Sequence, residues 1–255
     1  MIPRYQIDDN CVSVGHSLKE HVLSNLLKYG AIVLQDVDVS TDDSTLSVAG
    51  AIGSLKLGID ENLSGPMLMN IRYDSTKTPN GQRPAYFTDD FFPLHTDLSY
   101  VPNPPRFLLV HCLHPAPAGE GLTLLSDCAQ AFDLITKEAR LILASRVFSF
   151  AYPPGCLAGN SDVFPVYLDS PDYNLWRFRK DGMSYPEDAV KAVAEFQNAL
   201  EKVSFKIPLK TGDLLIVDNH RVAHGRTAFG PDKDGQYKRH LRRVYAQDNN
   251  RLGRH

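Results

Sequence analysis

The sequence predicts a mainly β protein with flanking helices, in which two antiparallel sheets form a barrel. Three observations support this fold class. The N-terminal part carries helical patterns, the chain from Phe107 onward is dominated by short apolar runs between Pro and Gly turns, and only a few further helices interrupt these runs. A parallel doubly wound sheet would require helices alternating regularly with strands. Neither an internal repeat nor a linker is visible, so residues 1–255 are interpreted as one domain.

The N-terminal part is expected to contain two helices and one strand. Apolar residues recur at helical spacing over Leu18–Tyr29, and Gly30 is well placed to end that helix. The apolar run Ala31–Val37 predicts a buried strand, and Ser44–Ile52 predicts a second helix. These elements would flank the barrel on one side.

The rest of the chain is predicted to be rich in short strands. Helices are expected from a cap at Ser126 to Ile135, from a cap at Thr136 to Ala144, and from Pro186 to about Lys202. The predicted strands are Phe107–Leu113, Gly121–Leu125, Arg146–Tyr152, Val163–Tyr167, Leu175–Arg179, Leu214–Val217 and His240–Ala246.

Composition and charge limit the classes of function. The net charge of -3 and the pI near 6.3 give no basic field, so nucleic acid is not an expected partner. No apolar run reaches the roughly 18 residues that span a bilayer, and the N-terminal residues lack a signal-peptide pattern. A cytoplasmic location is therefore expected, while the oligomeric state is not indicated. The scattered cysteines form no CxxC pair and are interpreted as free thiols: Cys11, Cys112, Cys128 and Cys156.

A metal site is indicated by the segment Pro93–Asp97. On a strand, His95 and Asp97 would point the same way, about 6–7 Å apart. A third ligand is available in His224, within the run VDNHRVAHGRTAF that follows a buried strand. Two imidazoles and one carboxylate on one face leave open positions for a bidentate co-substrate and O2, and this facial arrangement suits Fe(II). A His two residues before an Asp is common by itself, so the prediction depends on the surrounding sequence.

Four blocks in the same order resemble the TauD/TfdA family, and most closely the branch that includes clavaminate synthase and γ-butyrobetaine hydroxylase. The blocks are FFPLHTDLSY, HCLHPAPAGEGLTLLSD, GDLLIVDNHRVAHGRTAF and RHLRRVYAQ. The likeness runs from about Leu18 to Ala246. It implies a double-stranded β-helix (jelly roll), with Fe(II), 2-oxoglutarate and O2 as cofactor and co-substrates. It also implies that His95 and Asp97 are the proximal ligands and His224, not the nearby His220, the distal one.

The same resemblance assigns residues to the co-substrate. 2-Oxoglutarate carries a far carboxylate, which an arginine fork pairs with well. The family places this arginine some eleven to fifteen residues after the distal histidine, and Arg239 follows His224 by 15. Thr123 matches a threonine that binds the same carboxylate, and Arg243 matches an arginine that meets an acidic group of the substrate. Strand alternation puts Arg242 on the opposite face.

Further side chains are candidates for the substrate site. The aromatic residues near the metal segment are expected to pack in the core, and some of them to line the pocket. Arg226 is interpreted either as an electrostatic brace for the site or as a surface ion-pair partner. Trp176–Arg179 is a candidate lining strand, and Ser75–Phe92 a candidate lid. The predicted substrate-binding residues are Asn70, Arg72, Phe92, Tyr100 and Arg243.

The expected activity is oxidation of a small polar substrate. The resemblance implies hydroxylation of an unactivated C–H bond, with release of succinate and CO2. Arg243 could meet a carboxylate, which favours an amino acid or a derivative as substrate, although a sulfonate or another acid would fit this arginine equally. Asp97 favours oxidation over halogenation, because related halogenases lack the carboxylate ligand. Desaturation or cyclisation at the same site stays open. Two other classes remain as alternatives, a zinc hydrolase and a metal-free binding module.

Overall fold

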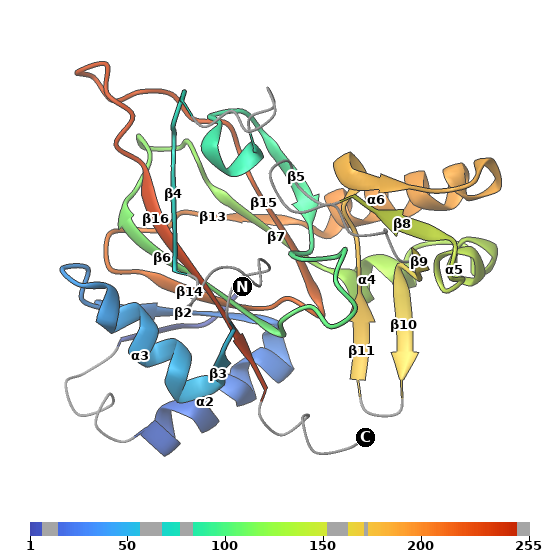
Figure 1. Cartoon of the computed structure of the whole chain (residues 1–255), viewed down its shortest axis with the longest axis horizontal. Coiled ribbons are helices and arrows are strands. Elements are labelled where there is room, and N and C mark those ends of the chain that lie inside the picture. Colours follow the sequence, from blue (N-terminus) through green and yellow to red (C-terminus); the bar gives the residue numbers. More distant parts are fainter. Residues whose placement is uncertain (7–14, 57–67, 77–83, 152–162, 171–172, 249–255) are drawn as a thin grey trace.

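The computed structural model describes residues 1–6, 15–56, 68–76, 84–151, 163–170 and 173–248 (Figure 1). Two β-sheets face each other across the middle of the molecule. The larger sheet has seven strands in the order β1-β2-β14-β6-β16-β3, and β4 also pairs with β16. Its strands are β1 (Arg4–Gln6), β2 (Ala31–Gln35), β3 (Ser54–Leu55), β4 (Met69–Arg72), β6 (Phe107–His114), β14 (Leu214–Asp218) and β16 (His240–Gln247).

The second sheet carries the strand that leads into the predicted metal segment. Its four strands follow the order β13-β7-β15-β5 and are antiparallel. Leu125 of this sheet packs with Leu108 and Tyr245 of the larger sheet in one buried apolar cluster. Two facing sheets with a shared core confirm the predicted jelly-roll architecture. The strands are β5 (Phe92–His95), β7 (Thr123–Asp127), β13 (Phe205–Ile207) and β15 (Val222–Arg226).

Helices cover the large sheet and build a separate lobe. α2 (Gly15–Tyr29) and α3 (Asp42–Ile52) pack on the outer face of the large sheet (Figure 1). Gly30 ends α2 as predicted, because its positive φ of 75° lets its N–H donate to the Leu26 carbonyl. The lobe contains α4 (Cys128–Asp133), α5 (Lys137–Leu143), α6 (Val190–Val203) and the short helices η3 (Lys180–Gly182) and η4 (Glu187–Ala189).

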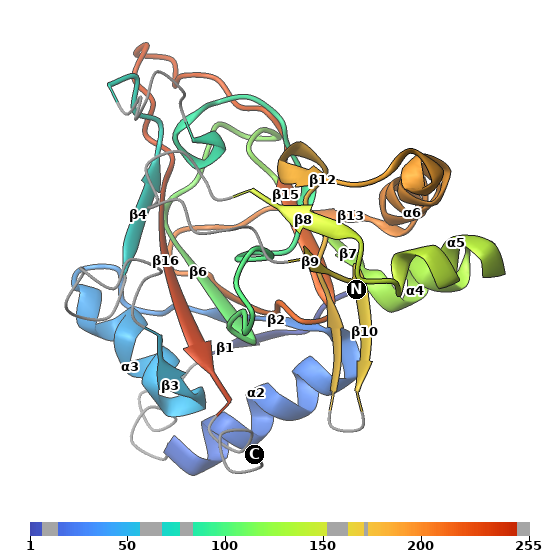
Figure 2. The ribbon, with the colours of Figure 1, turned by 45° about the vertical axis from the view of Figure 1, so that its right-hand side comes forward.

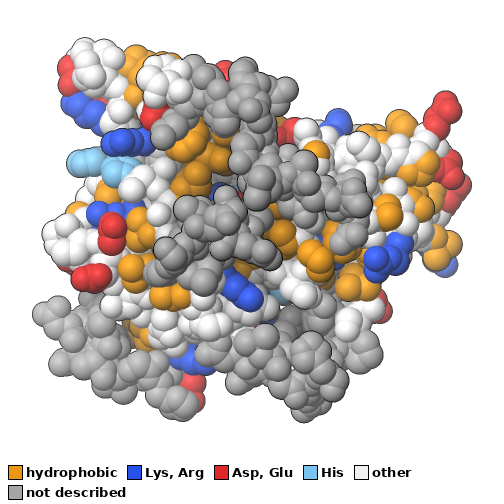
Figure 3. All heavy atoms as spheres, viewed as in Figure 1, with side chains coloured by type: hydrophobic (Ala, Val, Ile, Leu, Met, Phe, Trp, Pro, Cys, Tyr) orange, Lys and Arg blue, Asp and Glu red, His pale blue; other side chains and the backbone are white. Residues whose placement is uncertain are grey.

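Small strands complete the lobe beside the barrel. A three-stranded sheet has the order β12-β8-β9, and β10 pairs with β11 as a hairpin that projects from the body (Figure 2). Among the described residues, no helix is both long and apolar enough to cross a bilayer. On the face shown in Figure 3, basic and acidic side chains lie interspersed with apolar ones. These strands are β8 (Phe148–Phe150), β9 (Val163–Phe164), β10 (Tyr167–Ser170), β11 (Tyr173–Trp176) and β12 (Met183–Ser184).

Two local predictions are corrected by the structure. Asp127, not Ser126, caps α4, because its carboxylate accepts the N–H groups of Ala129 and Gln130. The hydroxyl of Ser126 donates instead to the Leu200 carbonyl on α6. The strand predicted at Leu175–Arg179 ends at Trp176, and the chain beyond it runs beside the metal segment.

Gly225 lets β15 approach β5 closely. A Cβ at this position would lie 2.6 Å from the Phe92 carbonyl oxygen, which is strand backbone and cannot move without moving β5. We expect Gly225→Ala to lower the free energy of unfolding by roughly 1–3 kcal/mol and to displace His95 at the end of β5. Urea unfolding measures this loss.

A matched control for Gly225 is Gly50, which lies exposed in α3. A Cβ there meets nothing within 4 Å. Gly50→Ala should raise the free energy of unfolding by up to about 1 kcal/mol, because alanine favours the helix. If Gly225→Ala were as stable as the wild type, the close approach of β15 and β5 would have no energetic consequence.

Candidate active site

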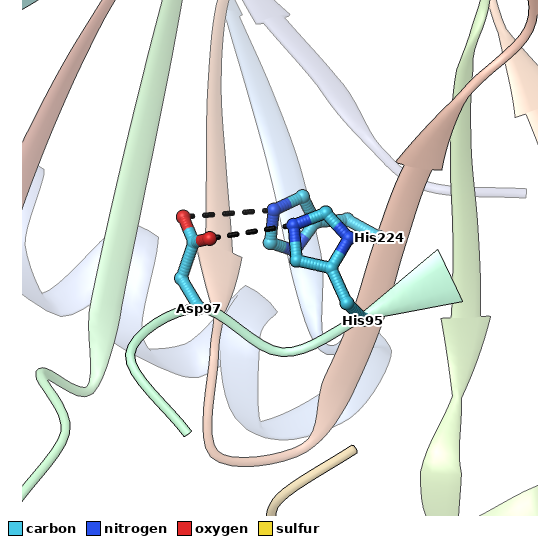
Figure 4. A group of neighbouring side chains, drawn as sticks. All are labelled: His95, Asp97 and His224. Carbon is cyan, nitrogen blue, oxygen red and sulfur yellow. Dashed lines mark ion pairs between the residues drawn. The ribbon is translucent and has the colours of Figure 1, made fainter. Parts of the chain in front are cut away.

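Three side chains converge at the edge of the small sheet where β5 pairs with β15. His224 on β15 lies directly opposite His95 on β5 in the strand register. The His95 Nε2 lies 3.4 Å from Asp97 Oδ1, and the His224 Nε2 lies 3.6 Å from Asp97 Oδ2. One potential ligand atom from each residue lies within 4.8 Å of the others. Figure 4 shows the three side chains facing one another.

Asp97 reaches this position from a turn, which corrects the expectation that it shares a strand with His95. β5 ends at His95, and the chain then turns through Leu98, whose φ is 59°. The neighbouring Thr96 is fixed in two ways, since its N–H donates to the Phe178 carbonyl and its hydroxyl accepts the Phe178 N–H. The Asp97 carboxylate therefore lies near His95 because hydrogen bonds to Phe178 hold the turn in place, and not because side chains alternate along a strand.

The side chain of Asn219 clamps the backbone of Asp97. Its Oδ1 accepts the Asp97 N–H at 2.7 Å, and its Nδ2 donates to the Asp97 carbonyl at 3.0 Å. The same Nδ2 also donates to the Pro105 carbonyl at 3.0 Å. Asn219 is 1% exposed, so this amide is shielded from competing water. These bonds fix the direction in which the Asp97 carboxylate points.

The carboxylate of Asp97 has two further partners from β16. The Tyr245 hydroxyl donates to its Oδ2 at 2.7 Å, and the Arg243 Nη1 lies 3.5 Å from the same oxygen. Burial acts to raise the pKa of Asp97, but Arg243 and the two imidazoles hold that pKa well below its usual range. Asp97 is therefore an anion suited to a cationic metal.

Both imidazoles direct Nε2 towards Asp97. The His95 Nδ1 lies 2.8 Å from the Pro93 carbonyl oxygen, which can only accept, so His95 carries a proton on Nδ1 and its Nε2 is the atom available to a metal. Burial, with a further contribution from His95, lowers the pKa of His224 to about 3. Two imidazoles and one carboxylate form a donor set that fits Fe(II), and also zinc.

The low pKa of His224 makes the stability of the apoprotein depend on pH. An unfolded histidine takes up a proton near its ordinary pKa of 6.5, whereas the folded His224 does so only near 3. The unfolded state thus binds more protons between these values, and stability falls as the pH falls from 6.5 towards 3. We expect the free energy of unfolding to drop by roughly 2–3 kcal/mol between pH 6.5 and 4.

Urea unfolding of metal-free protein at several pH values measures this slope. The variant His224→Asn should show a flatter dependence, since the group that titrates is absent. His111 also has a pKa lowered by burial, and it contributes equally to both proteins. Equal slopes in the wild type and the variant would contradict the prediction.

A pocket adjoins the three residues between the two sheets. The lining combines apolar and aromatic side chains with three arginines, of which Arg226 comes from β15, Arg243 from β16 and Arg239 from the residue just before β16. Phe92 lies at its edge and stacks on His95, with ring centroids 4.2 Å apart. Apart from the three convergent residues, the lining consists of Ile71, Tyr86, Phe92, Leu108, Val110, Thr123, Gly225, Arg226, Arg239, Leu241 and Arg243.

Arg239 is buried in this pocket with little compensation for its charge. It is 5% exposed, and burial, reinforced by Arg226, lowers its pKa to about 9. Its guanidinium is still charged at neutral pH. Among the described residues, Arg239 forms no ion pair of 4.0 Å or less. Thr123 lines the same pocket. A buried cation beside a hydroxyl is a site for an anionic ligand group.

Arg243 and Arg242 point to opposite faces of β16, as alternation predicts. Arg243 faces the pocket, where its Nη2 lies 3.0 Å from the Met69 sulfur and its guanidinium lies 5.6 Å from the ring centroid of Tyr86. Arg242 lies on the outer face and pairs with Asp42 at 2.9 Å. Of these two arginines, Arg243 is therefore the one placed to meet a ligand in the pocket.

Three of the predicted substrate residues are absent from the pocket lining. Asn70 and Arg72 on β4 are exposed, and the side chain of Asn70 bonds to His240 at 2.7 Å. The intervening Ile71 points into the pocket in their place. Tyr100 is buried in the apolar cluster that contains Leu94, and it is among the groups that act to raise the pKa of Arg243. Asn70 and Arg72 therefore lie outside the pocket lining, whereas Phe92 belongs to it.

Other candidates are also placed by the structure. His111 is buried against Thr45, and His220 is buried with its Nε2 2.8 Å from the Pro104 carbonyl, so neither faces the pocket. Arg179 from the WRFR segment lies 5.9 Å from the ring centroid of Phe92. The predicted lid includes residues 77–83, which lie outside the described residues.

Comparison with known proteins gives one family and several relatives. The family model described as taurine catabolism dioxygenase TauD, TfdA family matches residues 10–150 and 166–245. Clavaminate synthase 2 of Streptomyces clavuligerus is 29% identical over 215 residues, which cover 78% of this chain and 62% of that protein. L-asparagine oxygenase of Streptomyces coelicolor is 28% identical over 144 residues, 55% of this chain and 43% of that protein.

The fold is also similar to that of a solved oxygenase. A crystal structure of asparagine oxygenase in complex with Fe(II), 2S,3S-3-hydroxyasparagine and succinate superposes with a TM-score of 0.77 at 18% identity. The match covers 96% of this chain and 93% of that one. The chain spans less than two thirds of the length of the curated relatives named above, so their activities are not transferred with the fold.

Proposed function

Because the chain belongs to the TauD/TfdA family of taurine catabolism dioxygenases, we propose that it is an Fe(II)- and 2-oxoglutarate-dependent oxygenase. The proposed reaction is hydroxylation of an unactivated C–H bond in a small polar substrate, an amino acid or a derivative. This proposal rests mainly on one observation: a set of possible metal ligands lies next to a pocket that can bind an anion. The donor set of His95, Asp97 and His224 adjoins a pocket in which Arg239 is buried.

The metal would be held by His95, Asp97 and His224. When bound, Fe(II) and 2-oxoglutarate supply the oxidation of the substrate by O2, with succinate and CO2 as co-products. Arg239 and Thr123 bind the far carboxylate and thereby orient the co-substrate. Tyr245 and Asn219 hold the Asp97 carboxylate in place from the side chain and the backbone. Phe92 and the apolar residues of the pocket lining keep water from the reacting atoms.

The substrate class follows from charge. Arg243 faces the pocket from β16, and its buried Nε is without a hydrogen-bond partner among the described residues. A carboxylate of the substrate would satisfy this guanidinium. The names of two relatives, an L-asparagine oxygenase and an L-lysine 3-hydroxylase, support amino acids as the first compounds to examine.

The proposal is tested by adding Fe(II) and 2-oxoglutarate to the apoprotein without O2. We expect a weak visible charge-transfer band, followed by succinate release when O2 and the correct amino acid are supplied. Mass spectrometry of the product distinguishes gain of an oxygen atom from loss of two hydrogens, which separates hydroxylation from desaturation or ring closure. A zinc hydrolase would give no band and would turn over without O2.

A further inference from the structure

Two buried guanidiniums of the pocket lie beside the same aromatic ring. Arg226 and Arg239 are each 5% exposed, and their guanidinium carbons lie 4.9 Å and 5.2 Å from the ring centroid of Phe229. Within the part of the chain that the structure describes, the one hydrogen bond of the Arg226 guanidinium runs from Nη2 to the Asp90 carbonyl, at 2.6 Å. Its buried Nε is without a partner there. This part of the pocket therefore carries two positive charges and unused donors.

The positive charges of Arg226 and Arg239 repel each other. Burial lowers the pKa of Arg226 to about 10, although Asp89 and Asp90 act in the other direction. Arg226 in turn contributes to the lowered pKa of Arg239. Both guanidiniums are charged at neutral pH, and the folded protein bears the unfavourable energy of burying them together. An anion between them would remove that energy.

Strand register places the side chains of Arg226 and Thr123 on the same face of the small sheet. Arg226 on β15 is the direct antiparallel partner of Thr123 on β7, and directly paired side chains lie on one face of a sheet. His224, two residues before Arg226, lies on that face as well. Thr123, Arg226 and Arg239 all line the pocket that the metal-site residues share. Three donors of hydrogen bonds thus surround one end of the pocket.

We propose that Arg226 is a second binding residue for the far carboxylate of 2-oxoglutarate, which lies between the guanidiniums of Arg226 and Arg239. This inference rests on the proposed function. The competing role of Arg226 is purely structural: its bond to the Asp90 carbonyl holds the chain two residues before β5. Only the binding role makes the effect of Arg226 depend on whether the ligand has a far carboxylate.

The test compares two acids that differ only at that end. 2-Oxopentanoate carries a methyl group where 2-oxoglutarate carries its far carboxylate. Dissociation constants of both acids are measured by anaerobic calorimetry with Fe(II)-loaded wild type, Arg226→Gln and the control Arg242→Gln. Arg242 is a buried arginine on the outer face of β16, away from the pocket. The thermal unfolding midpoint of each variant is recorded alongside.

We expect Arg226→Gln to bind 2-oxoglutarate about ten- to hundredfold more weakly and to bind 2-oxopentanoate as the wild type does. Arg242→Gln should bind both acids as the wild type does. Arg226→Lys, which keeps the charge, should recover part of the lost affinity and serves if the glutamine variant fails to fold.

Two outcomes would overturn the inference about Arg226 without overturning the proposed function. These are an unchanged affinity for 2-oxoglutarate in Arg226→Gln, or an equal loss for both acids. Either result would leave Arg226 as a structural brace while the wild type still binds 2-oxoglutarate. A wild type that binds neither acid would overturn the proposed function as well, so the two failures are distinguishable.

Discussion

Asp97→Asn is expected to lose Fe(II) binding while keeping the fold. The asparagine is nearly isosteric and can still accept the hydrogen bond that Tyr245 donates at 2.7 Å. The Asn219 clamp acts on the backbone, so it is unaffected by the change. The lost group is the only carboxylate in the donor set. Since removal of an outer partner already weakens metal binding by about 10–100-fold, we expect loss of the carboxylate ligand to exceed that range.

The stability of Asp97→Asn should fall as well. Arg243 lies 3.5 Å from Asp97 and would be left without its counter-charge in a largely buried position. We expect the free energy of unfolding to decrease by roughly 1–3 kcal/mol. Metal affinity is measured by anaerobic titration with Fe(II), and stability by urea unfolding of the apoprotein.

Asp213→Asn provides the matched control for this experiment. Asp213 is also a buried carboxylate paired with an arginine, since Arg4 lies 2.8 Å from it, but it lies outside the convergent group. It should lose stability without losing Fe(II) binding. Wild-type affinity for Fe(II) in Asp97→Asn would show that the metal site is elsewhere or absent.

The parts of the site that follow strand periodicity were predictable from sequence. Arg239 and Arg243 line the pocket while Arg242 points outward, as a period of two requires. The convergence of His224 with the His95 segment followed from the resemblance of whole sequence blocks. β15 itself was not predicted, because VAHGR contains a glycine and two polar residues and lacks the apolar alternation of a half-buried strand.

The errors of prediction have two physical causes. Asn70 and Arg72 were placed in the pocket, but the register of β4 against β16 directs Ile71 inward, and a shift of one residue reverses every side chain. Asn219 and Tyr245 were missed because their contacts with Asp97 join residues 122 and 148 positions apart. Such contacts depend on the complete fold and leave no local pattern.

Arg239→Leu is expected to abolish tight binding of 2-oxoglutarate and yet to leave the apoprotein at least as stable as the wild type. Truncating one partner of a buried charge pair weakens binding by about 2–5 kcal/mol, or roughly thirtyfold to several thousandfold. In the apoprotein, by contrast, Arg239 is a buried cation whose pKa is lowered to about 9 by burial and by Arg226. Replacing it with an apolar side chain removes that unfavourable term.

An arginine that binds a ligand and an arginine that stabilises the fold respond differently to replacement by leucine. Loss of the first weakens ligand binding without lowering the stability of the apoprotein, whereas loss of the second lowers stability without weakening ligand binding. Arg242→Leu, on the strand that begins one residue after Arg239, should behave in the reverse way, because its ion pair with Asp42 at 2.9 Å and its bond to the Thr41 carbonyl at 2.6 Å stabilise the fold. It should lower the thermal midpoint and leave 2-oxoglutarate affinity unchanged. A drop in stability for Arg239→Leu comparable with that of Arg242→Leu would mean that Arg239 has a partner within the protein. The unneutralised charge of the pocket would then no longer argue for an anionic co-substrate.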